Sequence, residues 1–579
     1  MHRFRPAWHP KDIEYRWSAL NSLKGQTSRK RIPEVNKLLT ADCYPMTIVP
    51  GQSRLFLDYC AGVASARAFY ASLPPDPGQV VRPPLPAHWP ELVRLLAEQN
   101  SAPSPAAAAA LAALDKGAGT VVTGQQVALF GGPLFTPFKA ATAIAHARQA
   151  TAAGHPHAAI FWLATEDHDF DEVSQVSFPA GRELLKLVYS PALAPQNAES
   201  ARPVGGIVLD DSISPLADQA RELLGESDTM AALAEAYRPG RTFAQAFRDF
   251  YAKVFAQQGL LILDAGGRSI HRMGASVLRA AIERADELHA ALLERNSTLE
   301  AAGYRTQVAV TPQSSLLFLI DPQIGARRAL KRTAPSAAEP TGLWQAGGQK
   351  YSTAELVGVL DSEPERISPS ALLRPVFQDF LLSTSVQIAG PAEVAYLAQS
   401  AVLFERILGR PTPIAPRFSA TLIEPAIGEL LHKHELTVER VFEETPATLA
   451  QLLAARAMPV EGKQKLAAAG TALDAELTTL LEWMSAMDEG LGKSAETAAG
   501  KIRYQMNRLR TLASNFELQR QSTLGRHAEA ICQALYPGGV LEERQYGAAY
   551  YFARYGFGLA EELTAQAAGA CPGHAAIWL

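Results

Sequence analysis

Residues 120–171 contain a strand–loop–helix–strand pattern that restricts the fold more than any other part of the chain. An apolar segment at 120–123 enters a glycine-rich loop, an alanine-rich helical segment follows, and a second apolar segment covers 159–164. Thr136 and Pro137 suit the N-cap and the first position of that helix. Such βαβ units form parallel sheets, whose ligands bind beyond the carboxyl ends of the strands. The pattern therefore predicts an α/β fold with a ligand site at one sheet edge.

The first strand leads into a polar, glycine-rich turn. It contains Thr123, Gly124, Gln125 and Gln126, and Lys139 follows in the first turn of the helix. A turn of this kind before a helix exposes N–H groups and the positive end of the helix dipole, which suit a phosphate or carboxylate. The glycine spacing matches neither a P-loop nor a dinucleotide fingerprint. We predict that these five residues bind substrate, with a purely structural turn as the alternative.

The second strand ends in four carboxylates and one histidine within residues 166–171. These charges repel one another unless they face water, a cation or a substrate. They fit a divalent metal site, general acid–base chemistry by His168 oriented by Asp169, or an acidic capping loop. We predict catalytic roles for Glu166, His168 and Asp169 and a substrate-binding role for Asp167, and we assign no metal ligands.

A third polar motif lies at residues 374–379. Arg374 and Gln378 share a helical face if this segment is a helix, and Asp379 follows directly. The Arg374 guanidinium can bind a substrate carboxylate through two hydrogen bonds, or it can pair with an acidic side chain. We predict that all three residues bind substrate.

A fourth motif joins a strand at 386–390 to a helix that begins at Pro391. It offers a second helix N-terminus for an anion. We assign Gly390, Pro391, Glu393 and Tyr396 to a weak nucleotide-binding site. Further strands are predicted at 204–209, 259–264, 305–310 and 315–320, and a polar loop at 326–349.

Residues 461–535 contain no proline, and their apolar residues recur at steps of three and four. The first run is Leu473, Leu477, Leu480, Met484 and Met487; the second is Ile502, Met506, Leu509, Leu512 and Phe516. Two long antiparallel helices forming a coiled-coil hairpin explain this pattern, and two ordinary bundle helices are the alternative. We divide the chain into a core at 1–420, a coiled-coil domain at 421–536 and a segment at 537–579 that packs back on the core.

Length and charge exclude some classes of protein. A chain of 579 residues is too long for one simple core, and a net charge of −4 gives no reason to expect nucleic acid. The basic run at 24–31 is typical of a solvated loop. The sequence contains no apolar run of about 18 residues and no CxxC pair, so we expect a reduced, cytoplasmic protein without a membrane span.

Taken together, the motifs resemble the bacillithiol synthase family, the cysteine ligases of bacillithiol biosynthesis. The resemblance covers nearly the whole chain in the same order, and it rests on residues 123–126, 132–133, 139, 161–172, 374–379, 390–396 and 537–544. Glu542 stands where the family pattern has Gln. The resemblance implies a Rossmann-like core with connecting insertions and a long coiled coil that forms a homodimer.

The same resemblance implies an activity: cysteine is joined to the glucosamine amine of glucosaminyl-malate through an amide bond. It also implies that ATP or ADP can bind, although the His-Ile-Gly-His and Lys-Met-Ser-Lys-Ser signatures of class I synthetases are missing. We hypothesise that His168 removes the proton from the attacking amine. Two alternatives are a metal-dependent hydrolase of N-acyl sugars and a non-catalytic dimeric binding protein.

Overall fold

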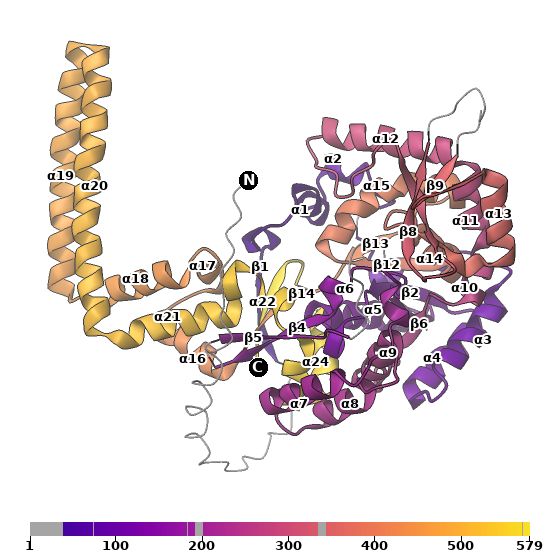
Figure 1. Ribbon diagram of the computed structural model, residues 1–579. Coiled ribbons are helices and arrows are strands. Elements are labelled where there is room, and N and C mark those ends of the chain that lie inside the picture. Colours follow the sequence, from indigo (N-terminus) through magenta and orange to yellow (C-terminus); the bar gives the residue numbers. More distant parts are fainter. Residues whose placement is uncertain (1–38, 73, 182, 192–200, 334–342, 570) are drawn as a thin grey trace. The chain divides into compact units, whose positions relative to one another are not determined.

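A five-stranded parallel sheet forms the centre of the fold, in the order β13-β12-β2-β3-β6 (Figure 1). Its strands are β13 (Ile414–Pro416), β12 (Thr384–Ala389), β2 (Gly119–Gln125), β3 (His157–Leu163) and β6 (Leu261–Asp264). This computed structural model describes residues 39–579 except 73, 182, 192–200, 334–342 and 570, so the basic run at 24–31 lies outside the described residues. The sheet and its helical connections confirm the predicted α/β class.

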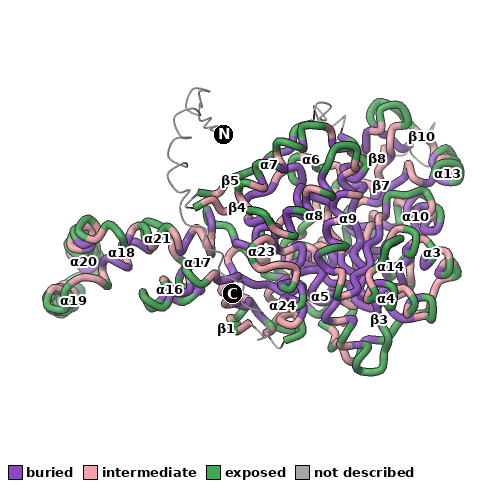
Figure 2. Tube along the Cα trace, turned by 90° about the horizontal axis from the view of Figure 1, so that it is seen from below, coloured by how far each residue is buried: buried purple, intermediate pink, exposed green. Residues whose placement is uncertain are grey.

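The central strands are buried on both faces because their successive side chains point to opposite sides. Val121 packs into one apolar cluster with α5 (Phe135–Ala152), whereas Val122 packs into another with α14 (Arg374–Leu382). The buried residues concentrate around this sheet (Figure 2). Other helices that cover it include α3 (Trp89–Gln99), α4 (Pro105–Asp115), α9 (Phe243–Val254) and α15 (Pro391–Leu408).

A second sheet is antiparallel and has the order β10-β9-β8-β7-β11. Its strands are β7 (Ser314–Ile320), β8 (Arg327–Arg332), β9 (Trp344–Ala346), β10 (Gln349–Tyr351) and β11 (Ile367–Pro369). The prediction of a polar loop at 326–349 is therefore wrong for the described part of that segment. In β8, Arg327 and Leu330 are buried whereas Ala329 and Lys331 are exposed, so part of the strand packs and part meets solvent.

Two predicted strands are also wrong. The segment 204–209 begins with a 3-10 turn, Val204–Gly206, that lies against Thr165 so closely that a Cβ on Gly205 would be 2.3 Å from the threonine Cβ. Residues 305–310, all described, form no strand, because the side-chain oxygen of Gln399 accepts the N–H groups of Gln307 and Val308. The carbonyls of Thr165 and Asp167 accept N–H groups of the first segment, and the Gln399 side chain accepts those of the second.

The predicted coiled-coil hairpin is confirmed (Figure 1). It consists of α19 (Val460–Met487) and α20 (Glu489–Arg520), and Asp488 caps the second helix by accepting the N–H of Leu491. The helices α18 (Pro446–Ala457) and α21 (Ser522–Leu535) pack against each other beside it. Within the described ranges, no helix combines the length and the apolar character needed to cross a lipid bilayer.

The C-terminal segment returns to the first described strand. In a three-stranded sheet, β15 (His574–Trp578) pairs with both β1 (Thr40–Tyr44) and β14 (Ser419–Ile423), and α24 (Leu559–Ala568) packs on α5. Cys43 and Cys571 form a disulfide with a Cα–Cα distance of 5.5 Å. The expectation of four reduced cysteines is therefore wrong for this pair, because the sheet brings two residues 528 positions apart into contact.

Candidate functional site

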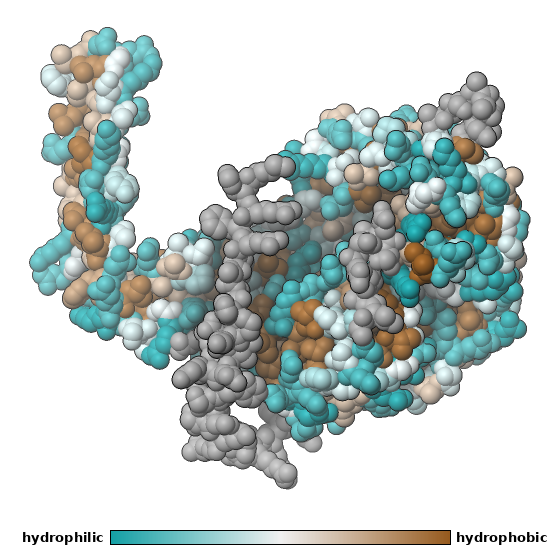
Figure 3. All heavy atoms as spheres, viewed as in Figure 1, coloured by the Kyte–Doolittle hydropathy of each residue, from teal (hydrophilic) through white to brown (hydrophobic). Residues whose placement is uncertain are grey.

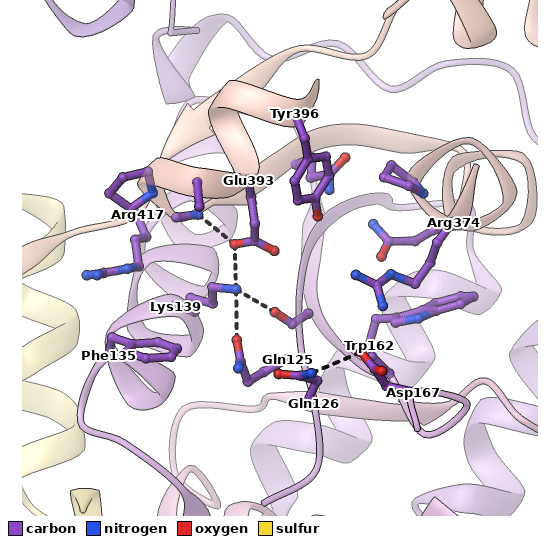
Figure 4. A pocket seen from close by; sticks show the side chains of 18 of the residues that line it. Gln125, Gln126, Phe135, Lys139, Trp162, Asp167, Arg374, Glu393, Tyr396 and Arg417 are labelled. Carbon is purple, nitrogen blue, oxygen red and sulfur yellow. Dashed lines mark hydrogen bonds and ion pairs between the residues drawn. The ribbon is translucent and has the colours of Figure 1, made fainter. Parts of the chain in front are cut away.

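A cavity of about 310 Å³ opens beyond the carboxyl ends of β2, β3 and β12 (Figure 4). This is the sheet edge that the βαβ pattern predicted. Its lining comprises Gly124, Gln125, Gln126, Phe135, Lys139, Trp162, Ala164, Asp167, Glu172, Arg374, Pro375, Gln378, Gln387, Gly390, Pro391, Ala392, Glu393, Tyr396, Arg417 and Arg544. Segments distant in sequence therefore meet around one volume.

Lys139 lies in this lining, in the second turn of α5, and its ammonium group is fully engaged by the protein. The Nζ atom lies 2.5 Å from Glu393 Oε2 and donates hydrogen bonds to Gly124 O at 2.8 Å and Gln125 Oε1 at 3.0 Å. Burial lowers the pKa of Lys139, and the Glu393 carboxylate opposes that shift. Lys139 thus links the turn after β2 to the start of α15.

The N-terminus of α15 is partly closed by its own side chain. Gly390 N donates to Glu393 Oε2 at 2.7 Å, so this N–H is already used inside the protein. Pro391 has no N–H to offer. Gly390, Pro391, Glu393 and Tyr396 line the cavity. The anion-binding capacity expected from this helix start is nevertheless reduced.

Gln126 connects the first polar turn to the acidic segment after β3. Its Nε2 atom donates to Asp167 Oδ2 at 2.9 Å and to Glu172 Oε2 at 3.1 Å (Figure 4). Burial favours a neutral Asp167, but Arg374 and Arg327 lower the pKa of this carboxyl below its ordinary value. Asp167 therefore contributes a negative charge to the cavity at neutral pH.

Arg374 and Gln378 both reach the cavity from α14, which is helical as expected. Arg374 lies close to Asp167 and to Tyr396, and burial raises the pKa of the Tyr396 hydroxyl to about 12. The phenol therefore keeps its proton and remains a hydrogen-bond donor. Among the described residues, Arg374 forms no ion pair within 4.0 Å.

Two further arginines line the cavity that we did not assign to a site from the sequence. Arg417 is buried and pairs with the buried Glu543, its Nη1 atom lying 3.0 Å from Glu543 Oε2. Arg544 follows Glu543 directly and, among the described residues, forms no ion pair. The only sequence signal for Arg544 was the resemblance of residues 537–544 to a family motif. That resemblance does not say what Arg544 contacts.

Two predicted substrate-binding residues do not line the cavity. Thr123 is buried within β2, and its hydroxyl donates to Ile388 O at 3.2 Å. Asp379 lies on the other side of α14, where its carboxylate pairs with Arg410 at 2.7 Å and accepts Thr384 N at 2.7 Å. Their contacts join elements of the core.

The residues predicted to be catalytic are also outside the cavity lining. Glu166 is buried and lies 2.9 Å from His271 Nε2. Asp169 does not orient His168; it caps a short helix, Phe170–Val173, by accepting the N–H of Glu172 at 3.1 Å. The acidic segment is therefore divided between a buried pair, a helix cap and the cavity, because a tight turn sends adjacent side chains in different directions.

His168 is held by Arg327, which lies in the segment predicted as a loop. Arg327 Nη1 lies 3.0 Å from His168 Nδ1. Because a guanidinium can only donate, Nδ1 accepts this bond and the neutral ring carries its proton on Nε2. Burial and the Arg327 charge lower the pKa of His168. The ring is therefore neutral at neutral pH, with its lone pair turned towards Arg327.

The described part of the chain contains no group of three or more His, Cys, Asp or Glu side chains arranged to hold a metal ion. The charges of the cavity are organised differently. Lys139 and Arg417 are each neutralised by a carboxylate, whereas Arg374 and Arg544 face the cavity without an ion pair among the described residues. Asp167 and Glu172 supply carboxylates on the same cavity. The arrangement suits a ligand that carries both negative and positive groups.

Comparisons with known proteins cover both parts of the chain. The N-terminal Rossmann-like domain of bacillithiol biosynthesis BshC matches residues 41–418, and the C-terminal coiled-coil domain of BshC matches residues 420–577. Relatives named "Putative cysteine ligase BshC" include a protein of Koribacter versatilis, 40% identical over 93% of this chain and 99% of that protein.

Two more relatives with that name are more distant. The protein of Solibacter usitatus is 32% identical over 77% of this chain and 82% of its own length. The protein of Salinibacter ruber is 30% identical over 76% of this chain and 80% of its own length. The chain belongs to the BshC family of bacillithiol biosynthesis, whose named members are described as cysteine ligases.

Proposed function

We propose that this protein joins cysteine to the glucosamine amine of glucosaminyl-malate, forming an amide bond in the cavity at the sheet edge. The observation that supports this most strongly is that Arg374 and Arg544 face one cavity without an ion pair among the described residues. Malate carries two carboxylates, and guanidinium groups bind carboxylates through two parallel hydrogen bonds. Asp167 and Glu172 offer acceptors to sugar hydroxyls and to an ammonium group.

The reaction requires an activated carboxyl group and a neutral amine. The amine nitrogen attacks the carboxyl carbon of cysteine, loses a proton, and displaces an oxygen leaving group. ATP would supply that leaving group, as an acyl phosphate with release of ADP or as an adenylate with release of pyrophosphate. Cavity residues Gly390, Pro391, Glu393 and Tyr396 are our candidates for neighbours of the nucleotide, with the cationic side chains of the cavity for its phosphates.

His168 is our candidate for the base that receives the amine proton. Its lowered pKa keeps the ring neutral, as a base must be. The lone pair on Nδ1 faces Arg327, so this role requires His168 to leave Arg327 when substrates bind. Asp167, whose Oδ1 accepts the N–H of His168 at 2.7 Å, connects this loop to the cavity.

We also propose that the coiled coil joins two copies of the chain. Large apolar side chains are exposed on it in two groups with the same spacing (Figure 3). They are Leu480, Trp483 and Met487 on α19, and Leu509, Leu512 and Phe516 on α20. Exposed apolar groups of this size mark interaction surfaces. Sedimentation should show a dimer that Leu512→Glu with Phe516→Glu dissociates; an unchanged dimer would place the interface elsewhere.

The direct test is to incubate the purified protein with cysteine and glucosaminyl-malate, with and without ATP. We expect a product whose mass equals the sum of both substrates less one water, formed only with ATP. Analysis of ADP, AMP and pyrophosphate then identifies the activated intermediate. Metal analysis of the same preparation tests the hydrolase alternative: stoichiometric zinc or manganese together with cleavage of an N-acyl sugar would contradict the ligase proposal.

A further inference from the structure

Arg544 lies where three cavities meet. The central cavity of about 310 Å³ shares Pro391, Ala392 and Arg544 with a neighbouring cavity of about 370 Å³. It shares Gln125, Gln126, Phe135, Glu172 and Arg544 with another of about 390 Å³. Of the described residues, Arg544 is the one that lines all three. Arg544 is therefore within the shared lining for a ligand that extends from the central cavity into either neighbour.

The two residues before Arg544, Glu542 and Glu543, anchor its backbone. It belongs to the short helix α22 (Glu542–Gln545), whose first two side chains are almost completely buried, at 0% and 1% exposure. Glu542 accepts the N–H of Leu422 at 3.0 Å and the hydroxyl of Tyr551. Glu543 binds Arg417 and accepts the hydroxyl of Ser419 at 3.2 Å. The turn is therefore fixed to β14 before any ligand binds.

The side chain of Arg544 contrasts with this anchored backbone. It is exposed to the cavities and, within the described part of the chain, pairs with no carboxylate. Burial of the site and the neighbouring Arg417 guanidinium lower the pKa of Arg544, and Arg417 itself is already neutralised by Glu543. Lys186 lines the third cavity with Arg544 and, among the described residues, forms no ion pair. Positive charge thus remains available at the junction.

We propose that Arg544 is a substrate-binding residue that holds an oxyanion, a carboxylate or a phosphate, at the junction of the three cavities. This inference rests on the proposed ligase function, which supplies two sources of that group: a malate carboxylate of glucosaminyl-malate and a phosphate of ATP. Arg374, on α14, is the other lining arginine without an ion pair among the described residues. The site therefore has two separate guanidinium groups for two separate anionic groups.

Arg544→Gln and Arg544→Lys test this proposal, with Arg94→Gln, an exposed arginine on α3, as the matched control. Loss of a charge-assisted hydrogen bond changes affinity by about 10- to 100-fold. In Arg544→Gln, we expect the KM for one oxyanion substrate to rise by about that factor, with a smaller effect on kcat. A rise for glucosaminyl-malate identifies a carboxylate, and a rise for ATP identifies a phosphate. Lysine should restore part of the loss.

The inference would be overturned if, for every substrate, Arg544→Gln had the same KM as the wild type. It would also be overturned if the glutamine and lysine variants lost equal activity with no change in KM. Calorimetry, which measures the affinity for malate and for pyrophosphate without turnover, distinguishes failure of this inference from failure of the proposed function. If the wild type forms no product but Arg544→Gln still binds either anion more weakly than Arg94→Gln, the oxyanion site stands and the ligase proposal fails. Equal binding by both variants overturns the site.

Discussion

At the scale of single residues, charge pairing decides which side chains can receive a ligand. The sequence pointed to Gln126, Lys139 and Asp167 because they follow strands at the ligand edge, and to Arg374 because it shares a predicted helical face with Gln378. Their pairing could not be predicted. Arg417 and Glu543 are 126 positions apart and meet only in the folded chain. The same limit explains why Asp379 was assigned to substrate, whereas its carboxylate binds Arg410.

Glu542 leads to a prediction about pH. Burial raises the pKa of this carboxyl well above its ordinary value, which favours its protonated form in the folded protein. A raised folded-state pKa gives stability that is fully present below the ordinary pKa of 4.5 and is lost as pH rises. Glu542→Gln should therefore increase the unfolding free energy at pH 8 more than at pH 5.

The slope of that difference is limited to about 1.4 kcal/mol per pH unit, the value for one proton. Denaturant unfolding of both proteins between pH 5 and pH 8 measures it. Equal stability changes at both ends of the range would show that Glu542 does not hold a proton in the folded state.

His168 allows a kinetic test of the base role. We expect His168→Ala to abolish ligation and to leave glucosaminyl-malate binding measurable. Because burial and Arg327 lower the pKa of His168 in the free protein, the wild-type kcat/KM should rise with pH through a value below 6.5 and stay constant above it. Rate measurements between pH 5 and pH 8 check this. Wild-type turnover by His168→Ala would remove the residue from the mechanism.

At the scale of elements, periodicity predicted the parts whose structure depends on local pattern. Strands β2, β3, β6 and β12 and the two long helices α19 and α20 follow from apolar runs and steps of three and four, whereas β13 was not predicted. Local pattern failed at 204–209 and 305–310, which are held by contacts distant in sequence: the Thr165 carbonyl for the first segment and the Gln399 side chain for the second. The site depends on such distant contacts between elements.

The packing of α14 gives a prediction at this scale. Gly274 lies between α10 (Arg268–Met273) and α11 (Ala275–Glu283), and a Cβ there would be 2.1 Å from the Phe377 ring. Gly274→Ala should displace Phe377 and its helix, lowering the unfolding free energy by about 1–3 kcal/mol and weakening substrate binding by Arg374. Thermal unfolding and KM values measure both effects.

The matched control is Gly358→Ala within α13 (Thr353–Ser362), where an added Cβ meets open space. It should stabilise the protein by about 0.5–1 kcal/mol, since alanine favours a helix interior over glycine. Similar effects of both substitutions would show that α14 tolerates movement at this contact.

At the scale of the whole molecule, the described ends of the chain meet in one sheet. The family models divide the sequence near residue 419, but β15, at the end of the second part, pairs with β1 from the first. The sequence indicated that the last segment changes character, whereas its strand partners and its disulfide to Cys43 depend on the assembled fold.

This disulfide should stabilise the molecule by closing a very long loop. Cys43→Ser should lower the unfolding free energy by about 2–5 kcal/mol under oxidising conditions. Reductant should lower wild-type stability to that of the variant and leave the variant unchanged. Unchanged wild-type stability in reductant would contradict this contribution.

The most direct measurement compares ligation by wild type, Arg374→Gln and Arg94→Gln, following by mass the condensed product of cysteine and glucosaminyl-malate. We expect product from the wild type and from Arg94→Gln, and a loss of about 10- to 100-fold in kcat/KM for Arg374→Gln, whose guanidinium faces the cavity without an ion pair among the described residues. No product from the wild type, or equal rates in all three proteins, would contradict the assignment of ligation to this cavity.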